Sequence, residues 1–164
     1  MMLCLTCGLQ RPNSYKNNTC PRCKSHLKYI EAAAKGTAVK LHKAGLSVSY
    51  ATAEVYSYNS YAVHTVNISI GLAKPYQVEV LRRLPEGYEY VFPEAHIIEY
   101  LSHIPIEHLL SPLLTYCVLR YEAQYLDNAE AKAVLKQKLI ELDDWVDEAV
   151  EDGWLAICNL GGLL

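Results

Sequence analysis

Two Cys-x-x-Cys pairs near the start of the chain constrain its fold more than any other feature. Cys4 and Cys7 form the first pair, and Cys20 and Cys23 form the second after twelve intervening residues. Each pair can form a tight turn whose two sulfurs point at one metal ion, and the interval between the pairs suits a short hairpin. The spacing therefore predicts a site in which four thiolates bind one zinc ion.

The residues inside and after the pairs favour such turns. Pro21 fixes φ in the second pair, and Gly8 permits a positive φ after the first. Over about residues 1–28 the pattern resembles a zinc ribbon, also described as a rubredoxin-like pair of knuckles. Four protein ligands leave no open position for a substrate, so the zinc is expected to be structural. It would fold a segment too short to build a core of its own.

Other interpretations of the cysteines remain open. Two disulfides would require an oxidising compartment, and the chain shows no secretory signal. A thioredoxin-like redox motif would have a single Cys-x-x-Cys beside a βαβ pattern. Iron or an iron–sulfur cluster would also accept four thiolates. His26 could add or replace a ligand, although a solvated or outer-shell histidine is the simpler interpretation.

Charge is distributed unevenly along the chain. Residues 1–45 carry eight Lys or Arg and one acidic residue, whereas residues 46–164 carry seven basic and seventeen acidic residues. Basic residues interleaved with aromatic ones suit a phosphate backbone and unstacked bases. The candidate nucleic-acid contacts are Arg11, Tyr15, Lys16, Arg22, Lys24 and Lys28. The alternatives are a solvated loop held by the metal, or a basic arm that packs against the chain's own acidic helices.

The rest of the chain predicts an α+β body over residues 29–164. Apolar residues at helical spacing indicate a helix over 30–44. Alternating segments then indicate strands of a small, mainly antiparallel sheet, at about 46–51, 55–58, 62–70 and 88–92. We therefore expect a zinc ribbon over 1–28 and one helix packed on a sheet over 30–92.

From residue 93 onward the pattern predicts an antiparallel helical hairpin and an apolar tail. Residues 94–103 have helical spacing. Ser111-Pro112 has the form of a helix start, followed by an apolar stripe that includes Cys117, Val118, Tyr121 and Tyr125. Asp127-Asn128 begins a second, longer helix that runs to about Asp152, with Gly153 as its C-cap. The apolar tail covers 154–164.

The long helix carries seven acidic residues within residues 141–152. Like charges one turn apart repel, and anions at a helix C-terminus oppose its dipole, so helix stability does not explain them. Four interpretations of these acidic residues remain open. They could form a solvated face, an intramolecular contact surface for the basic ribbon, a docking face for a basic partner, or a mimic of nucleic acid. The candidate docking residues are Asp143, Asp144, Asp147, Glu148 and Glu151.

No catalytic motif is recognisable, so we expect a non-enzymatic zinc protein of a bacterial or phage cytoplasm. The first hypothesis is a nucleic-acid-associated or regulatory factor that uses the basic ribbon. The alternative is a protein–protein adaptor or inhibitor, such as a phage product directed at host machinery, that docks through its acidic helix or apolar tail. An enzyme would need a site built from His64, His96, His103 or His108. The sequence indicates no membrane span and no small-molecule substrate.

Overall fold

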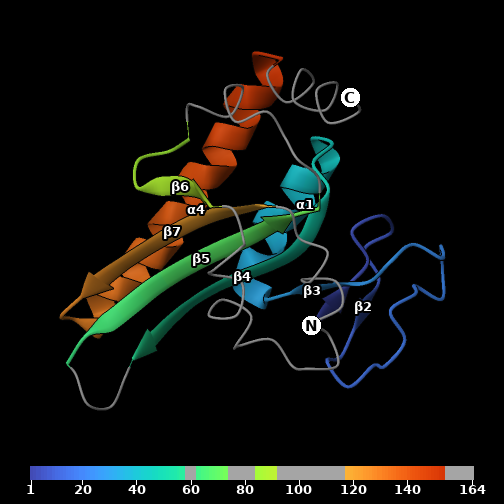
Figure 1. Cartoon of the computed structure of the whole chain (residues 1–164), viewed down its shortest axis with the longest axis horizontal. Helices are drawn as coiled ribbons and strands as arrows, with labels where there is room; N and C mark the ends of the chain where they lie inside the picture. Colours follow the sequence, from blue (N-terminus) through green and yellow to red (C-terminus); the bar gives the residue numbers. More distant parts are fainter. Residues whose placement is uncertain (58–61, 74–83, 92–116, 154–164) are drawn as a thin grey trace.

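A seven-stranded sheet forms the centre of the protein (Figure 1). The structure is a computed structural model that describes residues 1–57, 62–73, 84–91 and 117–153. The strands are β1 (Met2–Leu3), β2 (Gln10–Arg11), β3 (Lys28–Ile30), β4 (Val48–Ser57), β5 (His64–Leu72), β6 (Tyr88–Val91) and β7 (Cys117–Tyr125). The helices are a 3₁₀ turn η1 (Ala32–Ala34), α1 (Lys35–Lys43) and α4 (Asn128–Glu151). The predicted α+β class with a mostly antiparallel sheet is confirmed.

The strands lie in the order β2-β1-β3-β4-β5-β7-β6. Neighbours are antiparallel except β3 and β4, which run parallel with Tyr29 opposite Tyr50 and Ile30 opposite Ala51. A parallel pair needs a crossover connection, and η1 with α1 supplies it. The sequence-predicted boundary at residue 28 falls inside β3, so the cysteine-rich segment and the body share one sheet.

The two helices cover one face of the sheet. Alternate residues of β5, including Val66, Ile68 and Ile70, are fully buried in one core with Leu142 and Val146 of α4. Helix α1 packs on β4 and also contacts α4. Figure 1 shows α1 and α4 behind the long strands. This layer anchors β4, the strand on which the cysteine-rich segment is built.

The opposite face of β5 is polar and buried. Thr65, Asn67 and Ser69 alternate with the core residues, and each is at most 6% exposed. Two of the three are paired, because the Ser69 hydroxyl donates a hydrogen bond to Asn67 and the Asn67 amide donates one to Glu122 of β7. Satisfied polar groups can be buried at little cost, so this face is compatible with a stable sheet.

The helix predicted over residues 30–44 begins later than expected. Ile30, which fits the helical stripe, lies in β3, and α1 begins at Lys35 after the η1 turn. The residue pairs with Ala51 across the sheet, and this non-local pairing overrides its helical spacing. The extended segments expected at 46–51 and 55–58 belong to one strand, because β4 is continuous over Val48–Ser57, with a register shift between Val48 and Tyr50.

The predicted helical hairpin is wrong in its first helix. Residues Cys117–Tyr125 form β7, which lies between β5 and β6 and pairs with β5 over its whole length. Cys117, Leu119 and Tyr121 alternate into the core, so the true period is two. Residues 94–103, the start expected at Ser111-Pro112 and the apolar tail lie outside the described residues.

The long acidic helix is confirmed. The Asp127 side chain accepts a hydrogen bond from the Glu130 amide at the N-cap, and α4 runs over Asn128–Glu151. Gly153 follows with φ 75°, the backbone conformation expected of a C-terminal glycine. In the described ranges, no helix combines the length and the apolar composition required to cross a bilayer.

Candidate metal centre

The two Cys-x-x-Cys segments fold into knuckles with the same hydrogen bonds. In the first, the Gly8 amide donates to the Cys4 carbonyl at 2.8 Å and the Cys4 amide donates to Leu9 at 2.9 Å. In the second, the Lys24 amide donates to the Cys20 carbonyl at 2.9 Å and the Cys20 amide donates to Ser25 at 2.8 Å. The chain thus builds the same turn twice and places the two turns face to face.

The four sulfurs converge on one point. All four Sγ atoms lie within 4.8 Å of one another. Cys4 and Cys23 are separated by 3.4 Å, and Cys7 and Cys20 by 3.6 Å. Disulfides would need about 2.05 Å, and the cysteines are free. A tetrahedral ion with metal–sulfur bonds of about 2.3 Å would set its sulfurs about 3.8 Å apart. The donor set therefore fits one four-coordinate metal ion.

The thiols of this cluster differ in acidity. Burial raises the pKa of Cys4 to about 12. The side chain and backbone of Ser25 lower the pKa of Cys23 to about 6. Four unshielded thiolates at this distance would repel one another, so without a cation some of the thiols must keep their protons. A metal ion would replace those protons, and its binding is therefore coupled to proton release.

A small apolar cluster attaches the metal centre to the sheet. Cys4 and Cys20 are fully buried with Met2, Leu27 and Tyr50. The ring of Tyr50 lies against Gly71 of β5, where an added Cβ would lie 2.3 Å from the Tyr50 Cε1 atom. The knuckles therefore rest on β4 and β5 through one tyrosine, a contact that the sequence did not indicate.

The structure separates the predicted basic residues into two groups. Lys16, Arg22 and Lys24 are exposed, and Arg22 and Lys24 belong to the second knuckle. Arg11 and Tyr15 are partly buried and contact each other, with the guanidinium carbon 5.6 Å from the ring centroid. Lys28 is also partly buried, on β3. His26 is exposed and lies outside the sulfur cluster.

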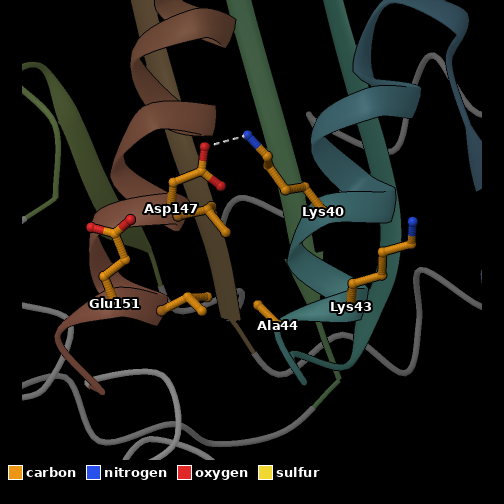
Figure 2. A pocket seen from close by; sticks show the side chains of 7 residues that line it. Lys40, Lys43, Ala44, Asp147 and Glu151 are labelled. Atoms are coloured by element: carbon orange, nitrogen blue, oxygen red, sulfur yellow. Dashed lines mark hydrogen bonds and ion pairs between the residues drawn. The ribbon is translucent and has the colours of Figure 1, made fainter.

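The predicted acidic residues do not share one face of α4. Asp147 accepts a hydrogen bond at 2.7 Å from Lys40 of α1, whose amine also lies 3.4 Å from the Asp143 carbonyl oxygen. Figure 2 shows Lys40 reaching across to Asp147, while Lys43 and Glu151 point away from each other. One lysine of α1 therefore pairs with the acidic helix, and among the described residues no ion pair joins α4 to the knuckles.

The other acidic side chains lie toward the turn before β6. Asp144 and Glu148 line a hollow of about 370 Å³ together with Glu86, Glu141 and Trp145. Lys138 pairs with Glu141 at 2.7 Å. Among the described residues, Asp144 and Glu148 form no ion pair. The sequence could not predict this hollow, because Glu86 is distant along the chain from the residues of α4 that also line it.

Comparison with known proteins gives no relative for this arrangement. No protein-family model, no curated protein and no solved structure matches the chain. The function must therefore be argued from the site itself.

Proposed function

We propose that the four cysteines bind one structural zinc ion and that the zinc-bound ribbon carries a nucleic-acid-binding surface. The filled d shell of zinc imposes no coordination geometry of its own. In structural sites with four thiolate ligands, zinc is the usual metal and is almost always tetrahedral. With all positions filled by sulfur, the ion would hold the knuckles together without taking part in chemistry. The free thiols fit a reducing compartment such as the cytoplasm.

One observation supports the nucleic-acid proposal: the cysteine-rich segment carries several cations and no carboxylate of its own. Residues 1–28 contain five Lys or Arg and no Asp or Glu. Zinc with four thiolates has two net negative charges, so three positive charges remain in excess. Lys16 and Arg22 are exposed, and neither forms an ion pair within the described part of the chain. Exposed cations that form no ion pair are suited to phosphate contacts.

The test is binding to random DNA and RNA pools across a salt series. The combined change Lys16→Ala and Arg22→Ala should weaken binding and reduce the salt slope by about 0.7 to 0.9 for each phosphate that the variant no longer neutralises. Lys132 and Lys136 are exposed on α4, so Lys132→Ala with Lys136→Ala is a control that removes the same charge. The control should leave the slope unchanged.

Two results would overturn the proposal. The first is absence of binding at low salt by a chain that holds its zinc. The second is equal weakening by the two double substitutions, because that would show a response to net charge alone.

The hollow beside Trp145 supports a second candidate, an adaptor that binds a basic segment of a partner protein. Its carboxylates from Asp144 and Glu148 are without basic partners among the described residues, and Trp145 offers an apolar wall. A Lys/Arg-rich peptide should bind the chain and lose affinity with Asp144→Asn and Glu148→Gln. Lys16→Ala and Arg22→Ala should have no effect on that binding, which separates the two candidates.

A further inference from the structure

A small basic cleft lies where the metal centre meets the body. Its volume is about 180 Å³, against roughly 30 Å³ for one water molecule in the liquid. Both knuckles, β3, the end of α1 and the start of β4 contribute to its wall. The lining residues are Leu5, Thr6, Ser25, His26, Lys28, His42, Ser47 and Val48. None of them is acidic.

The main observation is that the Lys28 side chain is partly buried without a partner of opposite charge among the described residues. It is partly buried in β3, and within the described ranges it has no hydrogen-bond acceptor and no carboxylate partner. Burial alone lowers the pKa of Lys28. A half-buried ammonium without a counter-ion costs free energy, and proteins usually provide a partner for such a group. The missing partner of Lys28 is therefore expected to be an anion that enters the cleft.

The other lining groups are donors or neutral. His26 and His42 bring imidazoles and Thr6 brings a hydroxyl, whereas the Ser25 side chain already hydrogen-bonds to Cys23. Burial, followed by the nearby charge of Lys28, lowers the pKa of His42. The carbonyls of Leu41 and His42 at the end of α1 accept hydrogen bonds from Leu46 and Gly45, so they do not present free acceptors to an anion.

We propose that this cleft binds one phosphate group, with the Lys28 ammonium as its charge partner and the His26 and His42 imidazoles and the Thr6 hydroxyl as its hydrogen-bond donors. A lysine commonly acts as a point charge toward phosphate. The phosphate would be either a free ion or one phosphodiester of a nucleic acid. The inference does not depend on the proposed function, because a free phosphate would fill the cleft even if the ribbon bound no nucleic acid.

A competing explanation is that Lys28 offsets the negative charge of the zinc–thiolate cluster. The two explanations predict opposite effects of Lys28→Gln. If Lys28 serves the metal centre, the substitution should reduce zinc retention and stability. If Lys28 instead binds an anion, the substituted chain should retain zinc. In phosphate-free buffer it should be at least as stable as the unsubstituted chain, because the substitution removes an uncompensated charge.

The experiment is a titration of the zinc-loaded full chain with inorganic phosphate at constant ionic strength, followed by two-dimensional NMR of amides and imidazoles. We expect local shifts at Thr6, Ser25, Lys28 and His42 with a Kd of about 1 mM. Lys28→Gln should weaken binding about tenfold. His42→Gln is a second variant if Lys28→Gln fails to fold. Lys16→Gln is the matched control, because it removes an exposed ribbon charge that does not line the cleft.

A second arm uses a short deoxythymidine oligonucleotide. If it shifts the same signals and competes with phosphate, the ligand is a phosphodiester. If only inorganic phosphate shifts them, the cleft binds the free ion, and the proposed function must rest on the exposed cations alone. Shifts spread over all basic residues, equal responses of Lys28→Gln and Lys16→Gln, or no local shift would overturn the inference.

Discussion

Gly8 and Lys24 occupy equivalent positions in the two knuckles, and both have a left-handed backbone. Their φ angles are 74° and 66°, and each amide donates to the carbonyl of the first cysteine of its pair. A positive φ is easy for glycine and costly for residues with a Cβ. Among the described residues, Lys24 is the only one other than glycine with a positive φ. The second knuckle is therefore strained where the first is not.

Lys24→Gly should relieve this strain. We expect it to raise the free energy of unfolding by about 0.5 to 1 kcal/mol, although the greater freedom of glycine in the unfolded chain offsets part of the gain. Urea denaturation of the zinc-loaded chain measures the change. Lys16→Gly is the matched control, since Lys16 is exposed without a positive φ, and it should not stabilise the protein. A lower free energy of unfolding for Lys24→Gly would contradict the presence of backbone strain at Lys24.

Removal of the metal should loosen the edge of the sheet more than its centre. Cys20→Ser, or a chelator, should abolish amide protection in β1, β2 and β3, while β5 and β7 keep theirs because their core lies against α4. Hydrogen exchange measures this difference. Cys117→Ser is the control, because Cys117 is buried beside Tyr90 and lies outside the sulfur cluster. It should keep one metal ion per chain. Unchanged protection after Cys20→Ser would contradict the assignment.

Gly71→Ala should be strongly destabilising. A Cβ at this position would lie 2.3 Å from Tyr50, whose side chain is only 2% exposed and cannot move away freely. Overpacking of this kind costs about 1 to 3 kcal/mol. Gly36→Ala is the control, since nothing lies within 4 Å of its added Cβ in α1, and alanine should stabilise that helix. Thermal unfolding compares the two variants, and equal midpoints would contradict the packing of Tyr50 on β5.

Stability should fall at alkaline pH. Burial, then the nearby charge of Glu141, raises the pKa of Tyr88, and burial raises that of Tyr50. A folded-state pKa above the unfolded value of about 10 stabilises the protein below that pH, and the contribution is lost as the pH rises further. Urea denaturation at neutral pH and at about pH 11 measures this loss.

Tyr88→Phe separates the hydrogen bond from the titration. The Tyr88 hydroxyl donates to the Lys138 carbonyl at 2.7 Å, so the variant should lose about 1 kcal/mol at neutral pH. Because phenylalanine does not ionise, the variant should lose less stability than the unsubstituted chain between neutral and alkaline pH. A parallel decline of the two proteins would contradict the burial of this hydroxyl.

Local signals in the sequence were sufficient to predict the cluster of four cysteines and α4. The cysteine spacing specifies two turns that need few other residues, and Asp127 caps a helix whose apolar period continues for several turns. Residues 117–125 were different, because Cys117, Tyr121 and Tyr125 fit a helical stripe and an alternating strand equally well. Pairing with β5, which is distant along the chain, decides between the two, and no local pattern reports it.

Interactions between distant segments were hidden in the same way. Three features join residues that are separated in the sequence. They are the packing of Tyr50 on Gly71, the ion pair between Lys40 and Asp147, and the cleft around Lys28. Charge asymmetry allowed a contact between a basic segment and the acidic helix as one of several alternatives, and it could not indicate that Lys40 makes such a contact. The side-chain geometry was needed for every one of these sites.

The most direct test of the account is X-ray absorption spectroscopy at the zinc edge, combined with intact mass, on chain purified under reducing conditions. We predict one zinc ion per chain with four sulfur ligands at about 2.3 Å. A first shell containing nitrogen or oxygen, or a metal-free chain whose mass shows two disulfides, would contradict the four-thiolate centre on which the ribbon is built.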